Sequence, residues 1–204
     1  MTETANPPPR PDDPDPSPYY RALGFALREI LIEKGVYSAE EERRAIDEVE
    51  GWNPEQGSRI VARAWTDPDY RARLLEDGKT ACEEMGATVT APQLIVLENT
   101  PQVHNVVVCT LCSCYPRSVL GLPPAWYKSA DYRSRVVREP RAVLAEFGTL
   151  IADTVEVLVY DSTADTRYLV LPMRPAGTEG MDAEALVGLI SRDSMIGVAI
   201  VPEP

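Results

Sequence analysis

The chain has 204 residues, 44% of them hydrophobic, and a formal net charge of −12. This length and apolar content suit one compact domain with an appendage. The acidic balance argues against nucleic acid and against an anionic membrane surface as partners, because both are bound by clustered Lys and Arg. The N-terminus lacks the basic start and apolar core of a signal peptide, and no apolar run is long enough to span a bilayer. We therefore expect a cytoplasmic protein.

The N-terminal segment, residues 1–18, contains seven prolines and almost nothing apolar, a composition typical of a flexible tail. Residues 19–85 are expected to form a helical arm. Its first helix would end near Gly35 and is predicted by an apolar stripe at helical spacing, formed by Leu23, Leu27, Ile30 and Leu31. Ser38 and Glu41 form a capping-box pattern that opens a second helix.

Two more helices are predicted in the arm. Apolar residues over 60–65 indicate the third. Asp67 followed by Pro68 is typical of a new start, because an N-cap residue precedes a proline at the first helical position. This fourth helix is expected to run toward Gly86 and to carry Cys82.

Beyond residue 86 the pattern changes to short β-rich runs bounded by turn residues, and we predict strands at 94–97, 103–108, 155–160 and 168–171. Residues 123–147 are predicted to be mostly helical with an interruption at Pro140, and a last helix is expected at 183–192. The predicted fold is α+β: a helical N-terminal arm followed by a layered α-β-β-α domain at 86–204.

Three of the four cysteines lie within six residues, in the pattern C-x-x-C-x-C at Cys109, Cys112 and Cys114. The cluster follows a β-type run and precedes Pro116, so we expect a tight loop at a strand end. Such close neighbours make a poor disulfide framework, because bridges gain most from closing long loops. A tight loop can turn three thiolates toward one point, and thiolates favour soft or strongly bound metals over Mg or Ca.

Two other interpretations of the cluster stay open. Structural zinc needs four closed ligands, so Cys82 or the single histidine, His104, would have to complete the site. A redox C-x-x-C needs neither Cys114 nor a metal, and it usually lies at a helix start. We interpret His104 as a structural strand residue and Cys82 as a buried helix residue.

The string at 109–115, Cys-Thr-Leu-Cys-Ser-Cys-Tyr, resembles the metal-claw motif of nitrile hydratase α subunits. The similarity extends over roughly residues 55–200. It includes Trp-Thr-Asp-Pro from Trp65, Leu-Gly-Leu-Pro-Pro from Leu120, Trp-Tyr-Lys from Trp126 and Arg-Pro-Ala-Gly-Thr-Glu-Gly from Arg174.

In that family one metal per chain is held by three cysteine sulfurs and two deprotonated backbone amides. The resemblance assigns the sulfurs to Cys109, Cys112 and Cys114, and the amides to Ser113 and Cys114. It also implies a sulfinate at Cys112 and a sulfenate at Cys114, which are successive stages of thiol oxidation.

Two further residues of the motif indicate the metal. Thr110 and Tyr115 resemble the cobalt-type pattern, whereas the iron type tends to carry Ser and Thr at these positions. The implied species is low-spin Co(III), with Fe(III) as the alternative.

The implied activity is that of a nitrile hydratase, a hydro-lyase that converts a small nitrile to its amide. Cys112 and Cys114 would be catalytic, and Asp161 and Arg167 would organise the site and the subunit interface. The resemblance also implies a β-type partner subunit, either one fused chain or two short ones, whose arginines hold the oxidised sulfur oxygens. A small activator or metallochaperone is implied for cobalt insertion.

The chain departs from the family pattern at Arg117, where ordinary nitrile hydratases usually have a tryptophan that lines the substrate region. We expect Arg117, Tyr115 and Trp126 to border the substrate pocket. The departure fits a specialised relative, either the three-subunit type of toyocamycin biosynthesis or the cobalt subunit of thiocyanate hydrolase. A non-catalytic zinc- or redox-binding module is the alternative of another class.

A basic stretch at 128–141 has five basic and two acidic residues in a chain that is acidic overall. Two interpretations are open. It is a solvated helix face, or, with Trp126, Tyr127, Tyr132 and Arg133, it is a docking surface for a partner chain, where aromatic residues and Arg are favoured.

Overall fold

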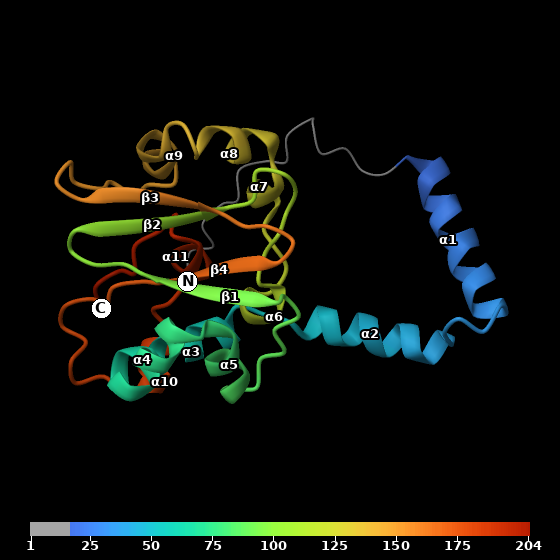
Figure 1. Cartoon of the computed structure of the whole chain (residues 1–204), viewed down its shortest axis with the longest axis horizontal. Helices are drawn as coiled ribbons and strands as arrows, with labels where there is room; N and C mark the ends of the chain where they lie inside the picture. The colour runs from blue at the N-terminus through green and yellow to red at the C-terminus, as the bar shows by residue number, and fades with distance from the viewer. Residues whose placement is uncertain (1–16) are drawn as a thin grey trace. The chain divides into compact units, whose positions relative to one another are not determined.

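The computed structural model describes residues 17–204, which divide into two compact units, one ending at Gly51 and the other spanning Trp52–Pro204 (Figure 1). Of the predicted tail at 1–18, only Ser17 and Pro18 fall within the described residues. The predicted arm at 19–85 is shared between the units, because its last three helices belong to the second one.

The first unit consists of α1 (Pro18–Glu33) and α2 (Ala39–Gly51), and neither helix has a buried residue. The predicted end of α1 is confirmed, since Gly35 follows it with φ +67°. The predicted capping box is also confirmed. The Ser38 N–H donates to Glu41 Oε2 at 2.7 Å, and the Glu41 N–H donates to Ser38 Oγ at 3.2 Å. An Arg28–Glu42 ion pair links the two helices at 2.6 Å.

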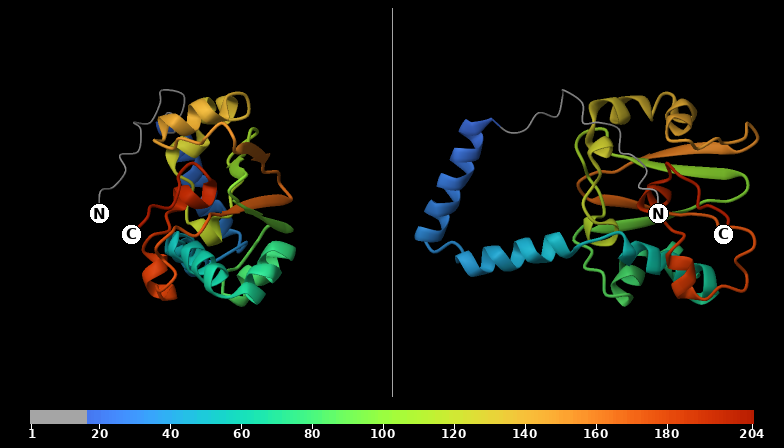
Figure 2. Two further views of the ribbon diagram at one scale, coloured as in Figure 1. Left: turned by 90° about the vertical axis from the view of Figure 1, so that its left-hand side faces the viewer. Right: turned by 180° about the vertical axis from the view of Figure 1, so that it is seen from behind.

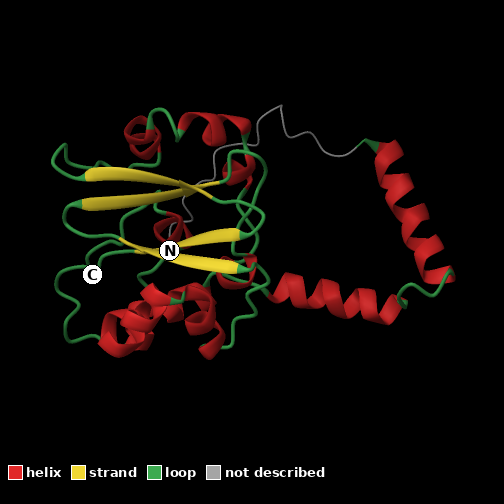
Figure 3. Cartoon of the chain, in the orientation of Figure 1, coloured by secondary structure: helices red, strands yellow, loops and turns green. Residues whose placement is uncertain are grey.

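The second unit has four layers, with two parallel strand pairs enclosed by helices (Figures 1 and 2). One helical layer contains α3 (Glu55–Thr66), α4 (Pro68–Glu76), α5 (Gly78–Glu84) and α10 (Ala183–Val187). The strand pairs are β1 (Gln93–Glu98) with β4 (Thr166–Leu171), and β2 (Val103–Val108) with β3 (Glu156–Asp161). The opposite layer contains α7 (Ala125–Lys128), α8 (Ala130–Arg135) and α9 (Pro140–Glu146). Short helices α6 (Arg117–Leu120) and α11 (Arg192–Ile196) complete the unit. The predicted α+β fold and all four predicted strands are confirmed (Figure 3).

Three predicted helices are shorter than expected, because a capping side chain starts a new helix within each predicted segment. The helix predicted from Asp67 to Gly86 breaks at Asp77, whose carboxylate accepts the Thr80 N–H at 3.1 Å and opens α5. Ser129 opens α8 in the same way, within the predicted helical segment 123–147. The helix predicted at 183–192 ends at Val187, and α11 starts anew behind Ser191.

The buried core joins both sheets to both helical layers, and β2 lies deep within it. Cys82 is buried in α5, as expected. His104 is buried in β2 with its Nε2 2.7 Å from the Gly197 carbonyl oxygen, so this nitrogen carries the proton and donates. Burial lowers the pKa of His104, which keeps the ring neutral. Its interpretation as a structural strand residue is confirmed.

Among residues 17–204, no helix combines the length and the apolar character that crossing a bilayer would require.

Candidate metal centre

The candidate centre is the cysteine loop, residues 109–114, which leaves the carboxyl end of β2. Cys109 is buried, Cys114 is half-buried and Cys112 is exposed. The Sγ atoms of Cys109 and Cys112 lie 3.4 Å apart, and those of Cys112 and Cys114 lie 3.2 Å apart. All three sulfurs fall within 4.8 Å of one another. The loop therefore brings three thiols to one point, which is open to solvent on the side of Cys112.

Backbone amides turn toward the same point. The Cys112 N–H donates to Cys109 Sγ at 3.3 Å. The pKa of the Cys112 thiol is lowered, first by hydrogen bonds from the thiols of Cys114 and Cys109, and also by the backbone N–H groups of Cys114 and Ser113. The three neighbouring sulfurs form a ligand set that fits a soft or strongly bound transition metal.

Cys114 has the opposite electrostatic setting. Partial burial and its hydrogen bond to the Cys112 thiol raise the pKa of Cys114 to about 12, while the positive charge of Arg167 acts in the other direction. Of these two neighbouring thiols, Cys112 therefore loses its proton first.

Asp161 fixes the start of the cysteine loop. It ends β3, where the parallel register places it beside Val108 at the end of β2. Its carboxylate accepts the Thr110 N–H at 2.9 Å and the Thr110 hydroxyl at 2.5 Å. A residue 51 positions away in the sequence thus holds the backbone between the first two cysteines.

Arg167 lies in β4, close enough to Cys114 for its charge to act on that thiol. Its guanidinium donates to the Thr163 carbonyl within the turn between β3 and β4. The sequence also allowed Asp161 and Arg167 to form only a surface ion pair between the two strands. No such pair forms within the described residues, because Asp161 binds Thr110 instead.

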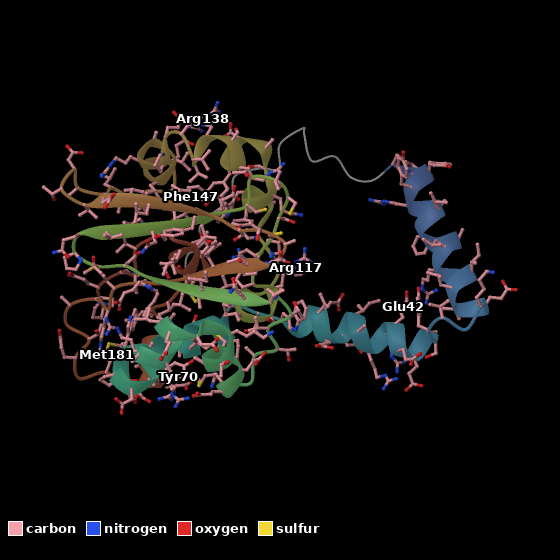
Figure 4. All side chains as sticks on the ribbon, viewed as in Figure 1. Glu42, Tyr70, Arg117, Arg138, Phe147 and Met181 are labelled. Carbon is pink, nitrogen blue, oxygen red and sulfur yellow. The ribbon has the colours of Figure 1, made fainter. Side chains whose placement is uncertain are left out.

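The residues expected to border a substrate pocket are placed differently from one another. Tyr115 and Trp126 are only 5% and 6% exposed. Trp126 packs edge-on against Tyr132 and Phe147, with ring centroids 4.9 and 4.7 Å apart, so it is part of an aromatic core. Arg117 is exposed at the start of α6 and projects away from the body of the second unit (Figure 4).

The docking-surface interpretation of the basic stretch is wrong for its aromatic residues, because Trp126, Tyr127 and Tyr132 are buried in the core. The charges are largely satisfied inside the chain. Arg135 forms ion pairs with Asp131, Glu139 and Glu146 at 3.3, 2.5 and 2.6 Å.

Sequence reasoning missed that α7 and α8 hold the backbone around the loop. The Tyr127 hydroxyl donates to the Cys114 carbonyl at 3.0 Å, and the Tyr132 hydroxyl donates to the Val107 carbonyl at 2.7 Å. Arg133 reaches the Thr110 carbonyl at 3.4 Å. Nothing in a local pattern distinguishes such inward-facing tyrosines from tyrosines at a docking surface.

The fold and the three-cysteine loop define an α+β protein with a cysteine cluster suited to hold a metal. The family model described as nitrile hydratase, alpha chain, matches residues 19–199, and the chain belongs to this family.

The names of individual relatives describe two activities, nitrile hydratase and thiocyanate hydrolase. The chain is 51% identical over 185 residues to the low-molecular weight cobalt-containing nitrile hydratase subunit alpha of Rhodococcus rhodochrous, covering 88% of this chain and 87% of that one. It is 46% identical over 197 residues to the thiocyanate hydrolase subunit gamma of Thiobacillus thioparus, covering 91% and 81%. A structure of recombinant thiocyanate hydrolase with partially modified cobalt centres superposes with a TM-score of 0.85 at 44% identity, covering 91% of this chain and 90% of that one.

Proposed function

We propose that this chain is the metal-bearing subunit of a cobalt nitrile hydratase, which adds water across a nitrile C≡N bond to give the amide. The observation that carries the proposal is the convergence of three cysteine sulfurs within 4.8 Å of one another in the cysteine loop. The 51% identity to a cobalt-containing nitrile hydratase subunit supports it.

Four residues of the loop would hold the metal. Cys109, Cys112 and Cys114 provide sulfur ligands, and the backbone nitrogens of Ser113 and Cys114 complete the set, with Cys112 and Cys114 oxidised. Co(III) bound there would act as a Lewis acid on the nitrile and lower the pKa of bound water.

Around the loop, Asp161 holds Thr110 in place, and Arg167 supplies positive charge on the side of Cys114. We assign both to organisation of the site. Tyr115 and Trp126 support the pocket from within the core, and Arg117 is the one residue of the proposed pocket set that the chain exposes.

The proposal includes a β-type partner subunit, as one fused or two short chains, and a small activator that inserts cobalt.

Thiocyanate hydrolase is the second candidate function, favoured by the 46% identity to its gamma subunit and by Arg117. A cobalt-loaded complex with its partner subunit decides between the two. Amide formed from a nitrile without ammonia supports the first, whereas ammonia and carbonyl sulfide formed from thiocyanate support the second. Elemental analysis that finds zinc and no cobalt would contradict both.

Arg117 is expected to set substrate preference. Its guanidinium is permanently charged and exposed close to the loop, so it favours polar or anionic substrates over apolar ones. We expect Arg117→Trp to raise kcat/KM for an apolar nitrile relative to a polar one by about tenfold, the effect of one changed polar contact, at unchanged cobalt content. Kinetics on a matched pair of nitriles measure this. A fall in cobalt content for the variant would instead assign Arg117 to the metal centre, and unchanged selectivity and cobalt content would remove it from the site.

Asp161 is expected to control how well the loop holds its metal. Asp161→Asn keeps the shape but leaves one of the two Thr110 donors facing an NH₂ group, at a cost of about 1–3 kcal/mol. We expect cobalt affinity to fall by about 10- to 100-fold, the range typical of residues that orient metal ligands. Competition with a chelator measures the affinity. Asp165→Asn, at an exposed position in the β3–β4 turn, is the matched control, and an equal loss there would argue against the role of Asp161.

A further inference from the structure

The two ends of the cysteine loop are held in different ways. The first end continues β2, is paired with β3, and is tied to Asp161 through Thr110. The second end, from Cys112 to Pro116, belongs to no helix or strand. Of the hydrogen bonds within residues 17–204, only that of Tyr127 reaches a backbone carbonyl of residues 111–114. Tyr127 is therefore the side chain that ties the Cys114 carbonyl to the core.

Tyr127 is well suited to hold that contact, because its ring has no room to move. Its side chain is fully buried in α7. The ring packs edge-on against Tyr115 and Trp126, with centroids 5.1 and 5.9 Å apart, and lies 5.8 Å from Tyr132. A rigid ring places its hydroxyl 3.0 Å from the Cys114 carbonyl oxygen with little rotational freedom.

Fixing this carbonyl also fixes the cysteine that carries it. The orientation of the carbonyl sets the backbone dihedral ψ of Cys114, and with it the direction of the Cα–Cβ bond that carries the sulfur. The other hydrogen bond of Cys114 is with the more exposed Cys112 thiol at 3.2 Å, which is no rigid anchor. Loss of the hydroxyl would let the sulfur move relative to Cys109 and Cys112.

We propose that Tyr127 is a positioning residue for Cys114, and that its hydroxyl holds the Cys114 sulfur in the geometry of the metal ligand set. The effect on the metal centre rests on the proposed function, whereas the effect on the geometry of the thiol does not.

The chain offers a matched pair of variants. Tyr127→Phe removes only the hydroxyl and leaves the ring packing. Tyr132→Phe removes an equally buried hydroxyl, which donates to Val107 at 2.7 Å, at the opposite end of the loop from Cys114, where pairing of β2 with β3 also holds the backbone. Both variants lose one buried hydrogen bond, so similar shifts in melting temperature are expected, and general destabilisation cancels in the comparison.

The first experiment uses the metal-free full chain and needs no activity. Iodoacetamide alkylation of each cysteine is followed by mass spectrometry. We expect Tyr127→Phe to raise the alkylation rate of Cys114 about tenfold relative to Cys112, while Tyr132→Phe leaves this ratio as in the wild type. An unchanged ratio in Tyr127→Phe, or the same change in both variants, would overturn the proposal.

The second experiment uses the cobalt-loaded complex. We expect Tyr127→Phe to change the sulfur-to-cobalt absorption bands and the sulfenate content at Cys114, and to lower kcat about tenfold at unchanged KM. Tyr132→Phe should keep the wild-type spectrum. A wild-type spectrum and kcat in Tyr127→Phe would refute the positioning role. If the alkylation ratio changes but the wild-type complex binds no cobalt, the proposed function fails and the positioning role stands.

Discussion

Replacing Cys114 with alanine is expected to abolish both tight cobalt binding and nitrile hydration, and Cys112→Ala should do the same. Each change removes one of three sulfurs that lie within 4.8 Å of one another, and Cys114 also contributes a backbone nitrogen to the proposed ligand set. We expect cobalt affinity to fall by more than about 100-fold, since even residues that only orient metal ligands are worth 10- to 100-fold. Elemental analysis after gel filtration measures the metal, and amide formation measures activity.

Cys82 provides the control for this prediction, because it is the one cysteine outside the loop and is fully buried in α5. Burial raises the pKa of its thiol to about 12, so it stays protonated and makes a poor metal ligand. Cys82→Ala should lower stability by about 1 kcal/mol through a small cavity and leave cobalt content and turnover unchanged. Full activity in Cys114→Ala, or cobalt loss in Cys82→Ala, would refute the assignment of the metal centre.

The strands of this fold could be predicted from the sequence, but their pairing could not. The run from Val103 to Val108 is β-branched and bounded by turn residues, so it indicates a strand without further information. Nothing in it identifies Glu156–Asp161 as its neighbour across some fifty residues. That pairing brings Asp161 to Thr110, so a key contact of the site comes from topology rather than from local pattern.

The predicted helix boundaries were wrong where a single capping residue starts a new helix inside a stretch that favours helix throughout. Asp77 and Ser191 lie inside stretches that favour helix, yet each accepts an N–H three residues ahead and starts a new helix. The break at Asp77 also suits packing, because a Cβ built on Gly78 would lie 2.5 Å from the Leu94 carbonyl oxygen. This close packing of α5 against β1 is a tertiary contact, and helix propensity alone does not predict it.

The cysteines of the site could be predicted from spacing and family resemblance, whereas the residues that support them could not. Tyr127 lies beside a basic stretch and suggested a docking surface, but its side chain is buried and points to the loop. Burial of an aromatic residue depends on which layer covers it, and a four-residue helix such as α7 is too short to show a buried face in its sequence pattern.

The cobalt-loaded chain without a partner is expected to remain folded and to be nearly inactive. Three thiolates and two amidates bring about five negative charges against three positive ones on Co(III), and the surplus needs cationic hydrogen-bond donors. Two cations near the loop are turned to backbone carbonyls instead, since Arg133 donates to Thr110 and Arg167 to Thr163.

The exposed side of the cysteine loop indicates where the missing donors must come from. Cys112 is open to solvent, and its neighbour Leu111 is 87% exposed, an arrangement that suits cover by another chain. Because one missing donor in such a site costs about 100-fold or more in turnover, we expect kcat/KM of the isolated chain to lie at least about 100-fold below that of the complex. Titrating the purified β-type partner into the cobalt-loaded chain should restore turnover, and the increase should saturate at a fixed ratio of subunits. A Leu111→Asp variant should require more partner to reach the same activity, because a buried charge opposes association. High turnover by a pure single chain, unaffected by added partner, would show that this subunit completes its own active site.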